Sequence, residues 1–567
     1  MKVYVKGTRQ EVDLSQKDYV AGGGEGEVYV KGSVAYKIYK DAAKMIPLGK
    51  VNELSAIADP AVIRPENVLV DSRGRAVGYT MRFIKQAWTL CQLFPRVFRE
   101  RNKVTEHMVF ELVRKLQESV EHVHQAQVLI VDMNEMNFLV SKKFDEIYFI
   151  DADSYQTKHF PATALMPSVR DWKTKLGDFT ENSDWFSFGI VSFQMFVGIH
   201  PYKGKHPKIH GFEDRMKAGV SVFNKDVSVP AVAYPLSTIP KEYKNWYESV
   251  FEKGERCPPP SKFGVVVVAP PVIKVLVGSA ALDIEELGDY DGQVIRVCGD
   301  SKNMIVVTDK SVWLNKRRLA SFTHQVLGIG FSEKGHVPIA IVDSDTDIPE
   351  LRNLVTGYPL NWQMATTKVE SYDGRVYCIL LDKVYEVVLT SAGNYVIAST
   401  RESAHVLEHA TNLYPGVAIQ RLLGATYVSI FSEAQTTHQM PIKRLDGYKI
   451  IDAKFDHGVL MVIGASPSGT YDRFVFRFDE NYSYDARMIS GVTPAGLNFV
   501  TLDSGVCVCI NEDDQLELFS ARKDSTQMKL IKDAAISGEM TIGECRDCVV
   551  VAHKNKVYKV SMRSTKP

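Results

Sequence analysis

The sequence lacks the features that mark secreted, membrane-spanning or nucleic-acid-binding proteins. Its 68 Lys and Arg residues balance 68 Asp and Glu residues, so we expect no general attraction to nucleic acids or anionic membranes. No apolar run approaches the roughly 20 residues that a membrane-spanning helix needs. No charged-then-apolar signal segment opens the chain, and we therefore expect a cytoplasmic protein.

Cysteine is also sparse, with eight residues scattered over 567 positions. Cys545 and Cys548 have the spacing of a metal-binding or redox pair, but no second pair with zinc-finger spacing follows them. Cys507 and Cys509 would share one face of an extended strand. We expect buried free thiols in a reducing compartment rather than a metal or redox site.

The length and composition predict several folded domains. A chain of 567 residues is too long for one hydrophobic core, and 45% hydrophobic with 24% charged residues is typical of a globular protein. A run of three prolines at 258–260 stiffens the chain and marks a boundary. We predict a first domain over residues 1–262, a Pro/Val-rich connector over 263–275 and a second domain over 276–567.

The second domain is predicted to be all-β. Beyond Lys274, short alternating runs of β-branched and aromatic residues recur between Gly, Asp and Asn turns. A strand–turn–strand unit returns after roughly 40 to 60 residues, which is the spacing of propeller blades. The pattern resembles a WD40-type β-propeller of six or seven blades without its Trp-Asp signatures, and a pair of β-sandwiches is the alternative. Closure of such a ring predicts that residues 557–560 lie beside a strand within residues 275–297.

In the first domain, a glycine-rich segment and a lysine-bearing strand predict a phosphate-binding surface. Gly23, Gly24 and Gly26 would let backbone N–H groups approach phosphate oxygens, because no Cβ intervenes. Val28 would cover a base from above. Lys37 lies in an apolar run that reads as a strand, and a lysine there can reach phosphates as a point charge.

Three polar residues follow predicted elements farther along the chain. Asp132 and Asn137 lie in a loop after a predicted helix over 107–127, and Asp151 follows a predicted strand over 146–150. An aspartate can accept or orient a hydroxyl proton. Carboxylate and carbonyl oxygens suit Mg²⁺, so Asn137 and Asp151 are the predicted metal ligands.

In this order, the motifs over residues 15–262 resemble the protein kinase family, and most closely the divergent bacterial kinases found beside tellurite- and stress-response genes. The resemblance implies an α+β bilobal fold, with an N-lobe at about 1–84 and a C-lobe at about 85–262. It implies ATP and Mg²⁺ as cofactors. It assigns catalysis to Lys37, Asp132, Asn137 and Asp151, and it places ATP against Gly23, Gly24, Gly26, Val28, Ala35, Lys37, Glu53, Met81 and Phe83.

The same resemblance gives individual roles to several of these residues. Asp132 matches the catalytic-loop aspartate, and Glu53 is the predicted partner of Lys37. Met81 matches the gatekeeper, after which residues 82–84 would present backbone groups to adenine. Asp184 matches the buried aspartate that opens the large C-lobe helix and braces the catalytic loop.

Departures from the family pattern bear on control and activity. Ile130 and Val131 stand where eukaryotic kinases carry His-Arg, so a phosphate on the activation loop would lack its usual arginine. Asn134 replaces the lysine that neutralises the transferring phosphate. Ala152 and Asp153 replace Phe-Gly, which removes the usual phenylalanine flip.

We therefore predict an ATP- and Mg²⁺-dependent serine/threonine protein kinase whose propeller recruits a protein substrate or senses a partner. The alternative is a pseudokinase scaffold that binds nucleotide or partners without phosphoryl transfer, which Asn134 and residues 152–153 favour. A small-molecule kinase ranks lower, because residues 154–183 are long enough for a peptide-binding activation loop. The sequence leaves the substrate, the propeller's ligand and the oligomeric state open.

Overall fold

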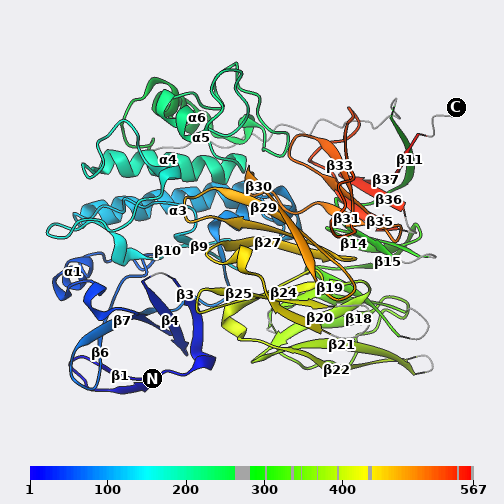
Figure 1. Cartoon of the computed structure of the whole chain (residues 1–567), viewed down its shortest axis with the longest axis horizontal. Helices are drawn as coiled ribbons and strands as arrows, with labels where there is room; N and C mark the ends of the chain where they lie inside the picture. Colours follow the sequence, from blue (N-terminus) through cyan, green and yellow to red (C-terminus); the bar gives the residue numbers. More distant parts are fainter. Residues whose placement is uncertain are drawn as a thin grey trace.

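The protein is multidomain and mostly β, with an N-terminal region of mixed helices and strands followed by a C-terminal region of strands (Figure 1). This computed structural model describes all residues except 24, 262–280, 300–302, 334–336, 347, 367, 393–394, 432–436, 546–547 and 564–567. Gly24 and the predicted connector over 263–275 therefore lie outside the described residues.

The N-terminal region begins with an antiparallel sheet. Over the described residues it has seven strands in the order β2-β1-β6-β7-β5-β4-β3. Helix α1 (Leu48–Leu54) follows β5 and begins after Pro47, which has no N–H to leave unpaired. The strands are β1 (Lys2–Val5), β2 (Glu11–Asp13), β3 (Tyr19–Gly22), β4 (Gly26–Lys31), β5 (Val34–Tyr39), β6 (Val68–Val70) and β7 (Ala76–Arg82).

Two long helices form the centre of the remaining N-terminal region. Helix α3 (Glu106–Gln125) begins where the Thr105 hydroxyl accepts a hydrogen bond from the Met108 N–H, and it buries one apolar face. Helix α4 (Glu181–Val197) is buried around almost its whole circumference and ends at Gly198 with φ 79°. The other elements are β8 (Ala87–Thr89), α2 (Arg96–Arg101), β9 (Phe138–Ser141), β10 (Ile147–Phe149), α5 (Phe212–Ala218) and α6 (Lys241–Glu248).

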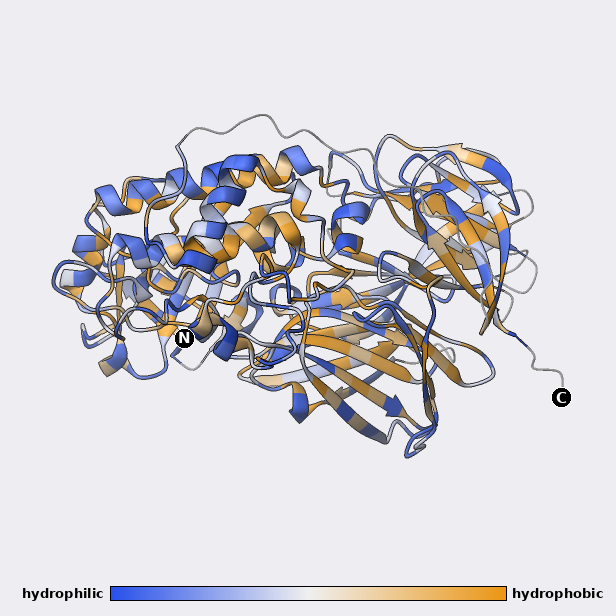
Figure 2. Ribbon diagram, turned by 90° about the horizontal axis from the view of Figure 1, so that it is seen from above, coloured by the Kyte–Doolittle hydropathy of each residue, from blue (hydrophilic) through white to orange (hydrophobic). Residues whose placement is uncertain are grey.

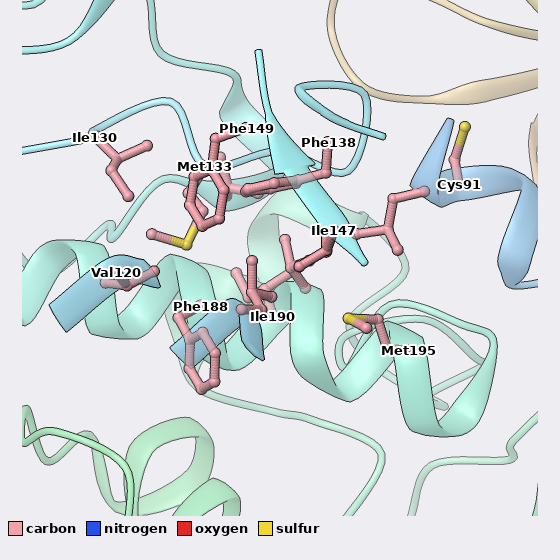
Figure 3. Close-up of a cluster of buried hydrophobic side chains, with 14 of the residues drawn as sticks. Cys91, Val120, Ile130, Met133, Phe138, Ile147, Phe149, Phe188, Ile190 and Met195 are labelled. Carbon is pink, nitrogen blue, oxygen red and sulfur yellow. The ribbon is translucent and has the colours of Figure 1, made fainter. Parts of the chain in front are cut away.

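The loop between α3 and β9 is anchored in this helical core. Figure 3 shows Ile130 and Met133 of the loop beside Phe149, on the side that faces Val120 of α3 and Phe188 of α4. All five side chains are at most 1% exposed. Removing such apolar anchors would create a cavity, so the loop has little freedom to move away from the helices.

The C-terminal region consists of consecutive antiparallel sheets, seven of them in the part of the chain that the structure describes. Each is a meander in which a strand pairs with the next one, apart from the sheet that joins β11 to the last three strands. Second strands such as β13, β17 and β28 are buried along their whole length. Figure 2 shows much of the strand-rich C-terminal region in orange, the colour of hydrophobic residues.

The strand bounds of the first four sheets along the chain follow. They are β11 (Leu282–Asp289) with β35 (Thr541–Cys545), β36 (Cys548–His553) and β37 (Lys556–Met562); β12 (Val294–Gly299), β13 (Met304–Thr308), β14 (Ser311–Leu314) and β15 (Arg317–Ser321); β16 (Val326–Phe331), β17 (Pro338–Val342) and β18 (Glu350–Asn353); and β19 (Val369–Tyr372), β20 (Arg375–Leu380), β21 (Lys383–Ala392) and β22 (Tyr395–His405).

Three further sheets complete the region. They are β23 (Thr411–Tyr414), β24 (Val417–Leu422), β25 (Ala425–Phe431) and β26 (Thr437–Pro441); β27 (Lys449–Asp456), β28 (Val459–Ala465), β29 (Tyr471–Phe478) and β30 (Tyr484–Val492); and β31 (Phe499–Thr501), β32 (Val506–Ile510), β33 (Gln515–Ser520) and β34 (Met528–Lys532).

The two ends of the C-terminal region pair with each other. Strand β11 is antiparallel to β37, with Ile284 opposite Val560. This confirms the prediction that residues 557–560 lie beside a strand within residues 275–297. The first strands of neighbouring sheets also contact one another, as β16 and β19, β23 and β27, and β31 and β35 do, and β35 contacts β12. The first and last strands of the region thus share one sheet.

The two regions share one continuous hydrophobic core. Ile451, Ile463 and Ala465 of the C-terminal region belong to the same buried cluster as Cys91 and Phe94 of the N-terminal region. The contact is therefore an extension of the core rather than a loose tether. Among the helices of the described residues, none combines the length and the apolar character that crossing a membrane requires.

Candidate functional site

Lys37 and Asp151, two of the residues predicted to be catalytic, meet where the N-terminal sheet faces the β9–β10 hairpin. Lys37 Nζ on β5 lies 3.2 Å from Asp151 Oδ1 and 2.6 Å from Asp153 Oδ2. The Tyr39 hydroxyl, two residues along the same strand, donates to Asp153 Oδ2 at 2.7 Å. Lys37 and Tyr39 project from the same face of β5, and both contact the segment that follows β10.

The hairpin itself brings Asn137 and Asp151 to one end. Phe138 of β9 is opposite Phe149 of β10, and the Ile150 N–H donates to the Asn137 carbonyl at 2.9 Å. Asp151 then adopts a left-handed conformation with φ 62° and ψ 31°. Such a conformation is costly for a residue with a side chain, and it turns the chain so that both Asp151 and Asp153 reach Lys37.

Asp132 lies in the same loop as Asn137 and contacts it. The Asn137 side-chain amide donates to the Asp132 carbonyl at 2.9 Å and lies 3.4 Å from Asp132 Oδ2. The other carboxylate oxygen, Oδ1, accepts the Met166 N–H at 2.7 Å, and Asp132 is only 8% exposed. Asn134, in the position of the expected lysine, is buried and accepts the Met136 N–H, so it shapes the loop.

Asp184 braces this loop from helix α4, as the family resemblance predicted. Its two carboxylate oxygens accept the Ile130 and Val131 N–H groups, each at 2.8 Å. His124 Nε2 of α3 lies 3.0 Å from the same carboxylate. A fully buried carboxylate is thereby paired with several donors, which makes the loop geometry rigid.

One face of the N-terminal sheet carries the residues predicted to contact a nucleotide. Lys37 is directly opposite Val28 on β4 and Tyr79 on β7, and Ala35 is directly opposite Met81. Residues opposite each other in an antiparallel pair project to the same face. Val28, Ala35 and Met81 therefore surround Lys37 on the face that meets Asp151.

The glycine-rich turn has a structural requirement of its own. A Cβ on Gly26 would lie 2.6 Å from the Ile38 carbonyl, so only glycine permits the close approach of β4 and β5. The Gly23 N–H donates to the Gly26 carbonyl at 2.9 Å, while the position of a Gly23 Cβ is open space. Gly26 is thus explained by strand packing, and the Gly26 carbonyl occupies the Gly23 N–H that was predicted to face phosphate.

Two predicted residues are placed differently. Glu53 does not pair with Lys37: its carboxylate lies 2.5 Å from His159 Nδ1 and also accepts the His159 N–H, so that prediction is wrong. The Phe83 N–H, expected to face adenine, donates to the Ser33 carbonyl at 2.9 Å. The hairpin between β4 and β5 therefore occupies this donor.

The charged groups of the site shift one another's pKa values. Burial alone would raise the pKa of Asp153, but the Lys37 ammonium and hydrogen bonds from Lys37, Tyr39 and Tyr79 outweigh it and hold this pKa below its usual range. Burial and then repulsion by Asp153 raise the pKa of Asp151, against the opposing effect of Lys37. Burial would lower the pKa of Lys37, but the two carboxylates raise it, so the lysine stays charged.

Three residues of the site were not predicted from the sequence. Asp153 is the close partner of Lys37, and its signal was the Asp151-Ala152-Asp153 repeat. Lys50 of α1 is 2% exposed. Burial lowers its pKa, and the negative charges of Asp153, Asp151 and Glu25 only partly oppose that fall. Tyr155 is buried near Asp184, Asp151, Asp132 and Asp153. Its pKa lies well above the usual value, mainly because of burial and to a smaller extent because of these negative charges.

The residues present fit a magnesium ion. Asp151 keeps 44% of its side chain exposed and has one oxygen 3.2 Å from Lys37, and Asn137 adds an amide oxygen at the same end of the hairpin. These are the hard oxygen donors that Mg²⁺ prefers. No cluster of three or more His, Cys, Asp or Glu side chains arranged for a metal occurs among the described residues. Mg²⁺ commonly uses one or two protein oxygens together with substrate phosphates, so a larger cluster is not required.

Comparison with known proteins gives no family assignment. No protein-family model matches this sequence, and no curated protein is significantly similar to it.

Proposed function

We propose that residues 1–262 form a bilobal protein-kinase-like domain that transfers a phosphoryl group from ATP, and that residues 276–567 form a seven-bladed β-propeller joined to it. The particular activity that we propose is Mg²⁺-dependent phosphorylation of serine or threonine in a protein partner. The family resemblance of the motifs and the geometry of the site both support this function.

One observation carries the proposal. Lys37, Asp151, Asn137 and Asp132, which the sequence separates by up to 114 positions, form a continuous chain of contacts: Lys37 to Asp151, the backbone beside Asp151 to Asn137, and Asn137 to Asp132. Phosphoryl transfer depends mainly on positioning and charge neutralisation, and this arrangement supplies groups for both.

Each residue has a role that its contacts support. Lys37, held by Asp153, which in turn accepts the Tyr39 hydroxyl, would bind phosphate oxygens as a fixed positive charge. Asp151 and Asn137 would hold Mg²⁺, which supplies charge neutralisation of the phosphates when bound. Asp132 would accept or orient the proton of the acceptor hydroxyl. Asp184 would keep the loop in place through the Ile130 and Val131 N–H groups.

The C-terminal region supports a propeller through its repeated meanders and its closure. Seven sheets occur in the described residues, and the sheet made of the last three strands takes its fourth strand, β11, from the start of the region. Such closure joins the first and last strands of the region and is typical of a rigid surface with short loops. We infer that this surface binds a protein substrate or partner.

Transfer of radiolabelled phosphate from ATP tests the proposed activity. We expect Asp132→Ala to lower the rate at least about 100-fold, because a positioned acid–base group contributes at least that much. The exposed Asp226 of the same region offers a matched control, and Asp226→Ala is expected to leave the rate unchanged. Equal transfer by Asp132→Ala and the wild type would remove Asp132 from this role.

A nucleotide-dependent scaffold without transfer is the second candidate. This candidate is favoured by the hydrogen bond that the Met166 N–H donates to Asp132 Oδ1. That bond occupies one of the two carboxylate oxygens that an acceptor hydroxyl could use. Magnesium-dependent stabilisation by ATP in a thermal-shift assay, combined with no change of intact mass after incubation with Mg-ATP, would support this candidate over the kinase.

A further inference from the structure

Two side chains of the C-terminal region reach the loop that carries Asp132 and Asn137. The Tyr471 hydroxyl, at the start of β29, donates to Glu135 Oε1. Lys449 Nζ, at the start of β27, donates to the Met136 carbonyl at 3.3 Å. Glu135 and Met136 lie between the two predicted catalytic residues, so this part of the loop is held from outside its own region.

The Tyr471–Glu135 contact is buried from both sides. Glu135 is 2% exposed and Tyr471 is 7% exposed. Burial raises the pKa of Glu135, while the hydrogen bond from Tyr471 opposes that rise. Because water cannot replace the Tyr471 hydroxyl at this depth, the loop conformation depends on that donor.

The turn between β28 and β29 also lies against Met166, a hydrogen-bond partner of Asp132. A Cβ on Gly469, in the turn between β28 and β29, would lie 2.5 Å from Met166 Sδ and 2.5 Å from Ser168 Oγ. The Met166 N–H is the donor to Asp132 Oδ1. Figure 1 shows β27, β29 and β30 beside α3 and α4, and the shared core includes Ile451 of β27.

We propose that Tyr471 and Lys449 are positioning residues for the loop over 132–137, and that the C-terminal region is a working part of the phosphoryl-transfer site. This inference rests on the proposed kinase function. It assigns the sheet β27–β30 a second task besides binding a partner: it fixes the distance between Asp132 and Asn137. A displacement of about 1 Å at such a loop can lower a rate about 100-fold.

Full-length Tyr471→Phe tests the inference, with Tyr448→Phe as its matched control. Tyr448 lies just before β27, and its hydroxyl donates to Asp472 Oδ2 at 2.8 Å, so the control loses a similar hydrogen bond away from the loop. We expect Tyr471→Phe to lower kcat at least about 10-fold and to change KM for Mg-ATP less than about twofold, because nucleotide contacts lie on the N-terminal sheet. Tyr448→Phe is expected to keep both constants within about twofold of the wild type.

Substitutions on the loop side separate positioning from general destabilisation. Glu135→Gln can still accept from Tyr471, so it is expected to retain more activity than Glu135→Ala. Lys449→Met keeps the aliphatic stem and loses the donor, and we expect a smaller fall in kcat than for Tyr471→Phe because its contact is longer. Equal losses in Glu135→Gln and Glu135→Ala would contradict the role of the hydrogen bond.

Hydrogen–deuterium exchange of peptides that cover residues 130–137 gives a readout independent of activity. We expect faster exchange in Tyr471→Phe and wild-type exchange in Tyr448→Phe. Unchanged exchange in Tyr471→Phe would overturn the positioning role whatever the activity. A wild-type protein that transfers no phosphate, yet shows the expected exchange difference, would overturn the kinase proposal alone and leave the structural coupling of the two regions supported.

Discussion

The two regions each contain a compact cluster of ion pairs, and the clusters differ in how completely their charges are enclosed. In the N-terminal region, Lys37 contacts Asp151 and Asp153, and Asp151 keeps 44% of its side chain exposed. In the C-terminal region, Glu517 has one oxygen on Arg473 and the other on Arg487, and its side chain is only 4% exposed.

This difference distinguishes the Lys37–Asp151–Asp153 cluster, which has an accessible carboxylate that could bind a cation, from the Glu517 cluster, which stabilises the fold. Both oxygens of Glu517 are used by guanidinium groups, and the pairs tie β29, β30 and β33 together. Asp151 instead retains carboxylate surface open to solvent. An incompletely neutralised, accessible carboxylate is what a cation site requires before the cation arrives.

The largest expected effect comes from Asp153→Asn. Breaking a buried ion pair leaves Lys37 with only the more exposed Asp151, and we expect a loss of about 3 kcal/mol in the free energy of unfolding together with weaker Mg-ATP binding. Urea denaturation and nucleotide titration measure the two effects. Asp13→Asn, at a side chain that is 67% exposed, is the control, with an expected change below about 0.5 kcal/mol. Unaltered nucleotide affinity in Asp153→Asn would place Lys37 outside the binding site.

Glu517→Gln is expected to cost about 2 kcal/mol of unfolding free energy, because two charge-assisted hydrogen bonds are weakened in a buried sheet. Phosphate transfer by the folded protein should stay at the wild-type level. Glu402→Gln breaks a pair whose carboxylate is 57% exposed and serves as the control, with a change below about 0.5 kcal/mol. A loss of transfer without a loss of stability would erase the distinction between the two clusters.

The smallest effect concerns Glu100 of α2, at the boundary between the regions. Burial raises its pKa from 4.5 to about 7, against hydrogen bonding by Gln293 and the charge of Arg96. An acid whose pKa is higher in the folded state holds more protons there, so its contribution to stability is present below pH 4.5 and is lost as the pH rises to about 7. We expect Glu100→Gln to be more stable than the wild type at pH 8 by about 1 kcal/mol and to show a smaller gain at pH 5. Thermal melts at both pH values check this, and a gain that does not depend on pH would assign the effect to packing.

Local elements of the fold were predictable from the sequence because their signals are local. The helix expected over residues 107–127 is α3 (Glu106–Gln125), and the strand expected around Lys37 is β5 (Val34–Tyr39). Alternation and turn residues predicted the β character of the C-terminal region. The number of sheets stayed open between six and seven, because the length of the region at four strands per sheet fits either number.

The site was predictable only where family motifs fix the spacing. Asp153 was missed as the partner of Lys37, because its position follows from the left-handed backbone of Asp151, which no local pattern encodes. Glu53 was chosen from its place on α1, yet His159 from a distant segment binds it. The contact of Tyr471 with Glu135 joins residues 336 positions apart, and one sequence carries no signal for such a pair.

The pairing of β11 with β37 has a consequence for how the protein is made. Ribosomes deliver a chain from its N-terminus at roughly 5–20 residues per second, so β11, complete at Asp289, waits tens of seconds for a partner that begins at Lys556. During this interval the nascent chain carries an unpaired strand and an unfinished seam. Co-translational folding can finish only with the last segment, so a prematurely terminated product presents an open edge that cellular quality control can recognise.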